Sequence, residues 1–320
     1  MAAAAPFIHD VRRRGSGEAA ARPDAEVSAA LRPFPSRPRI VGDMTKDAFT
    51  KLAAVYLRFA DEEYRDRSPL YEEIARGISS SAEVLGFLLT LPPNKRQPHL
   101  LLAAVRHRCG LASGWPQFRR GLLANPDAVR LTMLTHSVQT NEPTRCATLL
   151  PVFARLPQPL ALIEVGAAAG LCLLPDFYAY DYGDRIVRPE RSEPAPPVFR
   201  CTASAMTPLP SAMPRIVWRA GLDLNPLDAA DPAHAEWLRT LVWPEQTQRL
   251  ANLQAALEIA ALSRPRIERG DLLGGGLARL CREAPQCATL VIFHTAVLVY
   301  IESSSERQAF GERAMSLSDY

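Results

Sequence analysis

The sequence contains very little lysine. Only 3 of its 37 basic residues are lysine, and the other 34 are arginine. Residues 1–43 carry seven arginines against five acidic residues, which leaves 30 basic and 29 acidic residues in the rest of the chain. A nucleic-acid-binding protein concentrates positive charge on its folded part. This distribution therefore disfavours nucleic acid as a partner.

Cysteine is also scarce, and no two cysteines have the C-x-x-C spacing. The six cysteines are Cys109, Cys146, Cys172, Cys201, Cys281 and Cys287. A disulfide framework or a zinc site needs cysteines in closely spaced pairs. We interpret the six as buried thiols in a reducing compartment, and we expect no metal site.

Long apolar runs are missing as well. The longest, 288–301, is interrupted by His294 and Thr295 and is shorter than the roughly 20 residues that cross a bilayer. The first residues, M-A-A-A-A-P-F-I-H-D, lack the apolar core of a secretion signal. With 48% hydrophobic and 22% charged residues, the composition is that of a globular protein. We expect a cytoplasmic protein that does not associate with membranes.

The first half of the chain predicts a disordered extension followed by a helical cap. Residues 1–43 are rich in Ala, Arg and Pro, which is typical of a disordered segment. Helical patterns then fill 44–157, with starts at Ser68-Pro69, at Ser80 or Ser81, at Pro98, at Asn125-Pro126 and at 140–143. Gly77 is the predicted end of the helix that begins at Pro69.

The second half, 158–320, predicts an α/β domain. Strand-like segments at 160–165, 216–223, 265–271 and 288–293 alternate with helical patterns, and Pro244 interrupts the longest of these helical patterns, 237–262. Continuously apolar strands that alternate with helices indicate a parallel sheet covered on both faces. Between the first two strands, 175–213 reads as an inserted hairpin or excursion that contains Tyr178, Tyr180, Tyr182, Val187 and Phe199. The expected fold is a helical N-terminal cap plus a partial Rossmann-like, mostly parallel sheet.

The clearest chemical signal is the segment E-V-G-A-A-A-G at 164–170, which follows the first predicted strand and is expected to open a helix. Small residues let the backbone approach a ligand closely, and free N–H groups at a helix start favour anionic groups. Glu164, Gly166, Ala168 and Gly170 are therefore candidate cofactor-binding residues. The alternative is a strand–helix turn that packs without a ligand.

Two more acids end the next two predicted strands. Asp223 ends the second strand, where a carboxylate can accept hydrogen bonds from ribose hydroxyls. The usual spacing from the glycine turn is about 20 residues, whereas Glu164 and Asp223 are 59 residues apart, so the inserted segment must loop out. Asp271 ends the third strand. Each acid is alternatively a polar strand end or a helix cap, but ligands bind at the carboxyl edge of a parallel sheet.

Four other polar residues are candidates on the substrate side. His294 follows the fourth strand, and an imidazole there can serve as a general base. The alternative is a histidine that hydrogen-bonds to backbone. Gln139, Asn141 and Glu142 precede the fifth helical segment and are expected to face a pocket beside the cap, although helix capping explains Asn141 equally well.

Together these segments resemble a known family. The motifs V-Q-T-N-E, L-I-E-V-G-A-A-A-G-L, R-A-G-L-D-L-N-P-L-D, L-V-W-P-E-Q-T, E-R-G-D and V-I-F-H-T-A-V-L-V-Y look like the uncharacterised bacterial family known as domain of unknown function 2332, over roughly 45–310. The resemblance implies a helical part plus a methyltransferase-like Rossmann part, and it carries no established activity. Cys172 stands where we expect asparagine in such relatives.

The glycine segment also resembles the first motif of S-adenosylmethionine-dependent methyltransferases. That resemblance implies S-adenosylmethionine as cofactor, with Asp223 on the ribose and Asp271 near the adenine. The expected function is methyl transfer to an unknown small-molecule substrate. A nicotinamide-dependent oxidoreductase and a non-catalytic interaction module with this fold are the alternatives.

The predicted sheet is shorter than that of a complete methyltransferase domain. We find no fifth strand and no closing antiparallel pair between residue 293 and Tyr320. A sheet edge left open in this way promotes aggregation. We therefore expect either a truncated, inactive form or a partner, or the N-terminal helices, covering the edge.

Overall fold

A computed structural model describes residues 42–139, 141–190, 195–301 and 303–317. Of the expected disordered extension, 1–41 lie outside the described residues, whereas residues 42 and 43 belong to a helix. The described chain divides into two compact units. We call them the helical unit, up to residue 139 plus 240–246, and the sheet unit, 141–239 plus 247–317. The division therefore falls at 139–140, earlier than the expected boundary at 157.

The helical unit follows the predicted starts. Its helices are α2 (Gly42–Arg58), α3 (Pro69–Ser79), α4 (Ala82–Leu89), α5 (Pro98–Cys109), α6 (Trp115–Ala124) and α7 (Pro126–Thr135), with a π-helix η1 (Phe59–Tyr64) and a 3-10 turn η2 (Pro93–Lys95). Ser68 and Ser81 cap α3 and α4 by accepting the backbone N–H of Tyr71 and Val84. Helix α6 was not predicted. It begins directly after Gly114 and has a proline in its first turn, a pattern that is typical of a helix start.

Gly77 does not end α3, so that prediction is wrong. The helix continues to Ser79 because Gly77 serves packing instead. A Cβ atom at Gly77 would lie 2.2 Å from Cδ2 of Trp115, so only glycine leaves room for the indole. Packing against Trp115 therefore requires glycine at position 77, although the low helix propensity of glycine alone predicts a helix end there.

Aromatic rings form the core beside these helices. The hydroxyl of Tyr64 lies 2.9 Å from Nδ1 of His99, and the imidazole stacks on Trp243 with ring centroids 5.8 Å apart. Trp243 belongs to the segment 240–246, which interrupts the predicted long helix. Two helices result, α9 (Pro232–Leu241) and α10 (Thr247–Ser263), as expected from Pro244.

The sheet unit is built on four parallel strands, in the order β6 (Arg266–Arg269), β5 (Ile216–Asp223), β1 (Leu160–Val165) and β7 (Thr289–Phe293). Numbered along the chain, this order is 3-2-1-4, that of the first half of a doubly wound fold. Every residue of β1 is buried. The expected α/β architecture with a mostly parallel, Rossmann-like sheet is confirmed.

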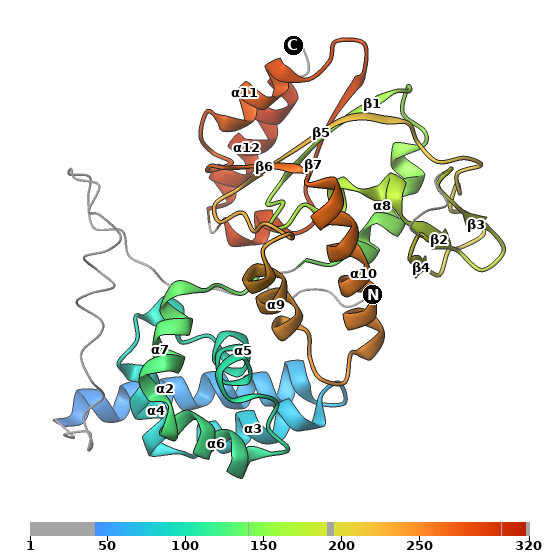
Figure 1. Ribbon diagram of the computed structural model, residues 1–320. Coiled ribbons are helices and arrows are strands. Elements are labelled where there is room, and N and C mark those ends of the chain that lie inside the picture. Colours follow the sequence, from blue (N-terminus) through green and yellow to red (C-terminus); the bar gives the residue numbers. More distant parts are fainter. Residues whose placement is uncertain (1–41, 140, 191–194, 302, 318–320) are drawn as a thin grey trace. The chain divides into compact units, whose positions relative to one another are not determined.

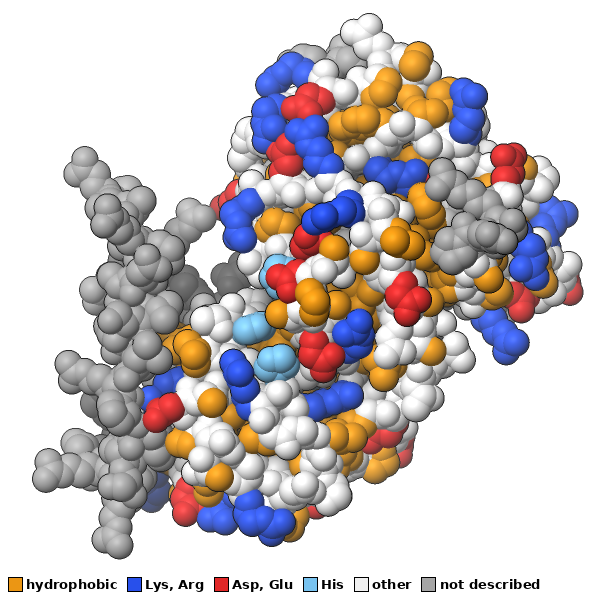
Figure 2. Space-filling model, viewed as in Figure 1, with side chains coloured by type: hydrophobic (Ala, Val, Ile, Leu, Met, Phe, Trp, Pro, Cys, Tyr) orange, Lys and Arg blue, Asp and Glu red, His pale blue; other side chains and the backbone are white. Residues whose placement is uncertain are grey.

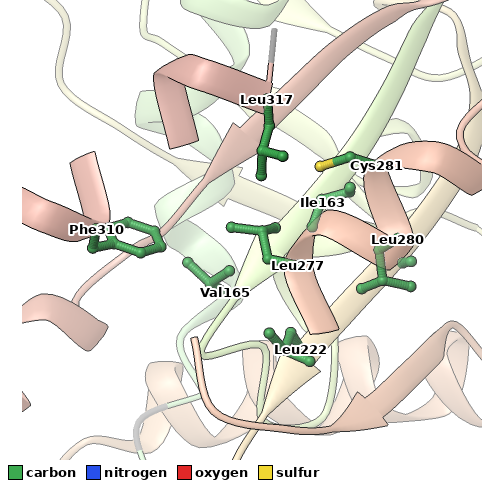
Figure 3. Close-up of a cluster of buried hydrophobic side chains, with 9 residues drawn as sticks. Ile163, Val165, Leu222, Leu277, Leu280, Cys281, Phe310 and Leu317 are labelled. Carbon is green, nitrogen blue, oxygen red and sulfur yellow. The ribbon is translucent and has the colours of Figure 1, made fainter. Parts of the chain in front are cut away.

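Helices cover both faces of this sheet. Helices α11 (Gly276–Glu283) and α12 (Ser304–Ser316) lie together beside it (Figure 1). Figure 3 shows the cluster that they form with the strands, which consists of Ile163, Val165, Ala220, Leu222, Leu277, Leu280, Cys281, Phe310 and Leu317. Side chains alternate along a strand, so Glu164 points to the opposite face. There Phe153 of α8 (Cys146–Phe153) packs against Phe293, with ring centroids 5.3 Å apart.

The inserted segment forms a small sheet of its own, in the order β3 (Ile186–Val187), β2 (Ala179–Asp181) and β4 (Val198–Arg200). Strands β2 and β3 are antiparallel, whereas β2 and β4 are parallel. The hydroxyls of Tyr178, Tyr180 and Tyr182 each donate to a backbone carbonyl at 2.6–2.9 Å. The predicted excursion therefore has its own buried, hydrogen-bonded aromatic core.

A bilayer-spanning helix needs both length and apolarity. Within the described ranges, no helix has enough of both to cross a membrane.

Replacing Gly77 with alanine tests the packing of α3. We expect Gly77→Ala to lower the free energy of unfolding by about 1–3 kcal/mol, because the new methyl group must displace Trp115. The matched control is Gly311→Ala in α12, where nothing lies within 4 Å of the added Cβ. That change is expected to stabilise by about 0.5–1 kcal/mol through helix propensity. Urea unfolding followed by tryptophan fluorescence measures both. A Gly77→Ala variant as stable as the wild type contradicts the packing described.

Candidate functional site

The turn after β1 holds the candidate cofactor residues in a strained backbone. Gly166 has φ +75°, Ala168 has φ +49° and Gly170 has φ +71°. Such angles favour glycine. A Cβ atom at Gly166 would also lie 2.5 Å from Cβ of Val297. Both glycines are thus required by conformation and packing, whether or not a ligand binds.

No α-helix follows this turn, so that prediction is wrong. The chain continues as two 3-10 turns, η4 (Leu171–Leu173) and η5 (Pro175–Phe177), and then enters the inserted sheet. Gly170 is in the left-handed region, and Pro175 removes a backbone donor five residues later, so a regular helix does not propagate. The turn therefore lacks the partial positive charge of a helix N-terminus.

The backbone amides of the turn are hydrogen-bonded within the protein. The N–H of Gly166 donates to the carbonyl of Leu222 at 2.8 Å, and that of Gly170 donates to Ala167 at 2.6 Å. The N–H of Ala167 also donates to the Leu222 carbonyl, at 3.4 Å, whereas side chains accept the amides of Ala168 and Ala169. Asp223 Oδ2 accepts from Ala168 at 2.8 Å, and Asn141 Oδ1 accepts from Ala169 at 2.9 Å. These contacts fix the shape of the turn.

Asp223 links three segments at the carboxyl edge of the sheet. Its Oδ2 holds Ala168, its Oδ1 accepts the N–H of Asn225 at 2.7 Å, and its carbonyl accepts the N–H of Gly270 at 2.9 Å. Each carboxylate oxygen retains a second lone pair, and the side chain is only half-buried. Asp223 is therefore a structural brace that can still accept hydrogen bonds from a ligand.

Glu164 is a buried acid beside this brace, with 2% of its surface exposed. Burial, followed by the neighbouring Cys172, raises the pKa of this carboxyl well above its usual value, although Arg145 opposes the shift. Thr295 hydrogen-bonds to Glu164 and accepts from Arg145 Nη1 at 3.0 Å. Among the described residues, Glu164 Oε2 has no hydrogen-bond partner. A buried oxygen without a partner is energetically costly, which marks this acid as a candidate ligand contact.

Asn141 and Glu142 belong to the sheet unit, but their side chains make different contacts. Asn141 holds the turn through Oδ1, and its buried Nδ2 finds no partner within the part of the chain that is described. Glu142 is engaged by Arg249 at 2.7 Å and by the hydroxyl of Thr144 at 2.6 Å, so it caps η3 (Pro143–Arg145). Gln139 belongs to the helical unit.

Asp271 and His294 follow the outer strands β6 and β7 and are exposed. Asp271 Oδ1 accepts the N–H of Leu273 at 2.9 Å, within the turn that leads to α11. Desolvation by surrounding atoms lowers the pKa of His294, even though the side chain is exposed, so neutral imidazole predominates at neutral pH. Parallel strands end at one edge, and Gly270 ties β6 to Asp223 there. The structure therefore gathers Glu164, Asp223 and the turn, with Asp271 and His294 flanking them.

Arg145 and Thr295 were missed by the sequence analysis. They are 150 residues apart in the chain, and no local pattern links them.

Cys172, the expected departure from relatives, is buried, and its Sγ lies 3.6 Å from the carbonyl of Glu142. Contact with Cys146, followed by burial, raises its pKa well above the usual value, so the thiol is inert. Within the described residues, no group of three or more His, Cys, Asp or Glu side chains is placed to hold a metal ion.

Removal of the Asp223 carboxylate tests its role as a brace. Asp223→Ala leaves the amides of Ala168 and Asn225 without acceptors, so we expect a loss of about 2–3 kcal/mol of unfolding free energy. Asp271→Ala, which removes one exposed contact, is expected to cost less than about 1 kcal/mol. Urea unfolding of the two variants in parallel measures the difference, and equal losses contradict the assignment.

The pH dependence of stability tests the buried acid. The folded chain retains a proton on Glu164 that the unfolded chain releases above pH of about 4.3. Stability therefore falls as pH rises from there toward the raised pKa of the folded state. We expect Glu164→Gln to remove this decline. Glu258→Gln, at an exposed position of α10, is expected to leave it unchanged. Thermal unfolding measured across this pH range tests the prediction. Identical plots of stability against pH for Glu164→Gln and wild type contradict a neutral Glu164.

The comparisons with known proteins give a family without an assigned activity. Neither a curated protein nor a solved structure matches the chain. Residues 53–317 match the model of a family described as an uncharacterized protein conserved in bacteria, domain of unknown function 2332. This match covers most of the chain and agrees with the resemblance carried by its motifs. The protein is a member of the DUF2332 family.

Proposed function

We propose that the carboxyl edge of the sheet unit binds S-adenosylmethionine and that the protein is a methyltransferase whose substrate is unknown. One observation carries the proposal. The acid at the end of β5 contacts the glycine turn after β1, through Asp223 Oδ2 and the amide of Ala168 at 2.8 Å. In Rossmann-like folds these two elements hold the ribose and the adjoining part of a nucleoside cofactor.

The polar groups of the site fit such a cofactor. Glu164 Oε2 and Asn141 Nδ2 are buried and without partners among the residues described. S-adenosylmethionine carries an ammonium, a carboxylate and a sulfonium, so it offers a positive group to Glu164 and an acceptor to the Asn141 amide. The second lone pairs of Asp223 would accept the ribose hydroxyls, and Asp271 would lie toward the adenine.

The same contacts disfavour a nicotinamide dinucleotide. A pyrophosphate is held by free turn amides and a helix N-terminus. Here the amides from Gly166 to Gly170 are engaged within the protein, and no α-helix follows them. A cofactor without phosphate groups fits this turn better.

The residues of the chain would contribute mainly positioning. When bound, the cofactor would supply the methyl group carried on its sulfonium for transfer to an acceptor, with the thioether S-adenosylhomocysteine as the leaving product. Glu164, Asp223 and Asn141 would fix the cofactor and so orient the reacting carbon. His294, which stays largely neutral at neutral pH, would accept a proton from the acceptor at the edge of β7.

Calorimetric titration tests the proposal. We expect S-adenosylhomocysteine to bind and NAD not to bind. Asp223→Asn, which replaces one acceptor oxygen by a donor, is expected to weaken binding about tenfold or more. Glu258→Gln, exposed on α10, serves as the matched control and is expected to bind like the wild type.

Two results contradict the proposal. Binding of NAD but not of S-adenosylhomocysteine indicates an oxidoreductase. Binding of neither by a folded protein, as judged by circular dichroism, indicates a module that keeps the fold without the cofactor.

A further inference from the structure

A cavity of about 370 Å³ opens in the sheet unit beside the carboxyl end of α8. Pro151, Ala154 and Arg155 line it on the side of the helix, and residues 208–214 line it on the side of the segment that leads to β5. Its volume lies within the range of small-molecule sites, about 300–1,000 Å³. We call it the proline cavity, because four of its eleven lining residues are prolines.

The proline cavity lies away from the proposed cofactor site. Gln158 precedes β1 and Pro214 precedes β5, and these parallel strands pair where they begin, at Leu160 and Ile216. The cavity is therefore at the amino edge of the sheet, whereas Asp223 ends β5 at the carboxyl edge. The six residues of β1, at about 3.3 Å each, separate the two edges by about 20 Å. A ligand in this cavity is thus independent of the cofactor.

Hydrogen bonds hold both sides of the cavity in place. Gln158 Nε2 donates to the carbonyl of Phe153 at 3.0 Å, and Gln158 Oε1 accepts the N–H of Arg215 at 2.9 Å. Across the cavity, Arg185 Nη1 donates to the carbonyl of Pro210 at 3.2 Å. The proline rings also fix φ at four positions of the lining. The cavity is therefore formed before a ligand enters, which lowers the cost of binding.

The lining is mostly apolar and offers few hydrogen-bond donors. Proline has no N–H, and the Gln158 amide already donates to the carbonyls of Phe153 and Leu156. None of the described residues that line the cavity is acidic. The sequence around them contains no acid either, from 143 to 163 and from 195 to 222. This composition favours a ligand that is largely apolar and carries no positive charge.

Arg155 is the charged residue of the lining, and its side chain is exposed. Within the part of the chain that the structure describes, its guanidinium has no hydrogen bond or ion pair. Many cations of this chain are paired. Arg219 pairs with Asp176 at 2.8 Å, and Lys or Arg side chains lie next to Asp or Glu side chains at several places on the face seen in Figure 2. Arg155 therefore keeps its N–H groups available to an anion from outside the chain.

We propose that the proline cavity binds a small apolar molecule with a single carboxylate, such as a fatty or aromatic acid. Arg155 holds the carboxylate, because a guanidinium matches its two oxygens with parallel N–H donors. The proline rings and Met213 contact the apolar part. One guanidinium balances one negative charge, whereas a phosphate dianion would leave a second charge among apolar groups. An amine would place a second positive charge beside Arg155.

Titration of the whole chain with octanoate tests the proposal. Calorimetry measures the affinity, and the NMR signal of the Met213 methyl group reports on the cavity. We expect octanoate to bind saturably and to shift this signal. 1-Octanol has the same chain without the charge. It is expected to bind about tenfold more weakly, because it lacks the charge-assisted contact with Arg155.

Three variants separate the charge from the apolar contacts. Arg155→Gln is expected to weaken octanoate binding about tenfold and to leave 1-octanol binding unchanged. Ala212→Trp, at an exposed position of the lining, fills the cavity and is expected to weaken both. Arg282→Gln removes an exposed arginine of α11 that is outside the lining, and it is the control that retains wild-type affinity. Circular dichroism checks that each variant is folded.

Three results overturn the proposal. The first is the absence of a saturable response to octanoate, which means that the cavity takes no such ligand. The second is wild-type octanoate affinity in Arg155→Gln, which means that this arginine serves the end of α8 alone. The third is equal affinity of the wild type for octanoate and 1-octanol, which indicates apolar adsorption without recognition of a carboxylate.

Discussion

The hydrogen bond from the Ala168 amide to the Asp223 carboxylate organises the carboxyl edge of the sheet. It joins the turn after β1 to the end of β5, across 55 residues of sequence. Asn141 makes a parallel contact with Ala169 from a third segment. Since carboxylate acceptors form strong bonds with backbone N–H groups, these contacts hold a left-handed turn without a following helix. Val297 lies against Gly166 of that turn, and Gly270 donates to the carbonyl of Asp223.

Glu164 is a buried acid in the strand that leads into this turn. The sheet places its carboxyl on the face away from α11 and α12, where Thr295 and Arg145 reach it but one oxygen remains unpartnered. Burial favours the neutral acid. A ligand with a positive group would favour the charged acid instead, so the cost of the buried carboxyl becomes a source of selectivity. The proposed cofactor would thus give a reason for an acid near the carboxyl end of a buried strand.

Much of the fold was predictable from the sequence, because local rules dictate it. Strands β1 and β7 are largely apolar because helices cover the faces of the sheet, and Ser68, Ser81 and Pro244 act through local geometry. The failures have tertiary causes. Gly77 makes room for Trp115, and the turn at 166–170 uses its amides internally. The Arg145–Thr295 contact spans 150 residues, so only the fold reveals it.

Amide hydrogen exchange at Ala168 and Ala169, measured by NMR on the free protein, tests the central claim most directly. If Asp223 and Asn141 hold the turn, both amides exchange slowly, and Asp223→Ala accelerates exchange at Ala168 far more than in the strands of the sheet. Fast exchange of both amides in the wild-type protein would contradict the account, because the turn would then be free of the contacts on which the site is built.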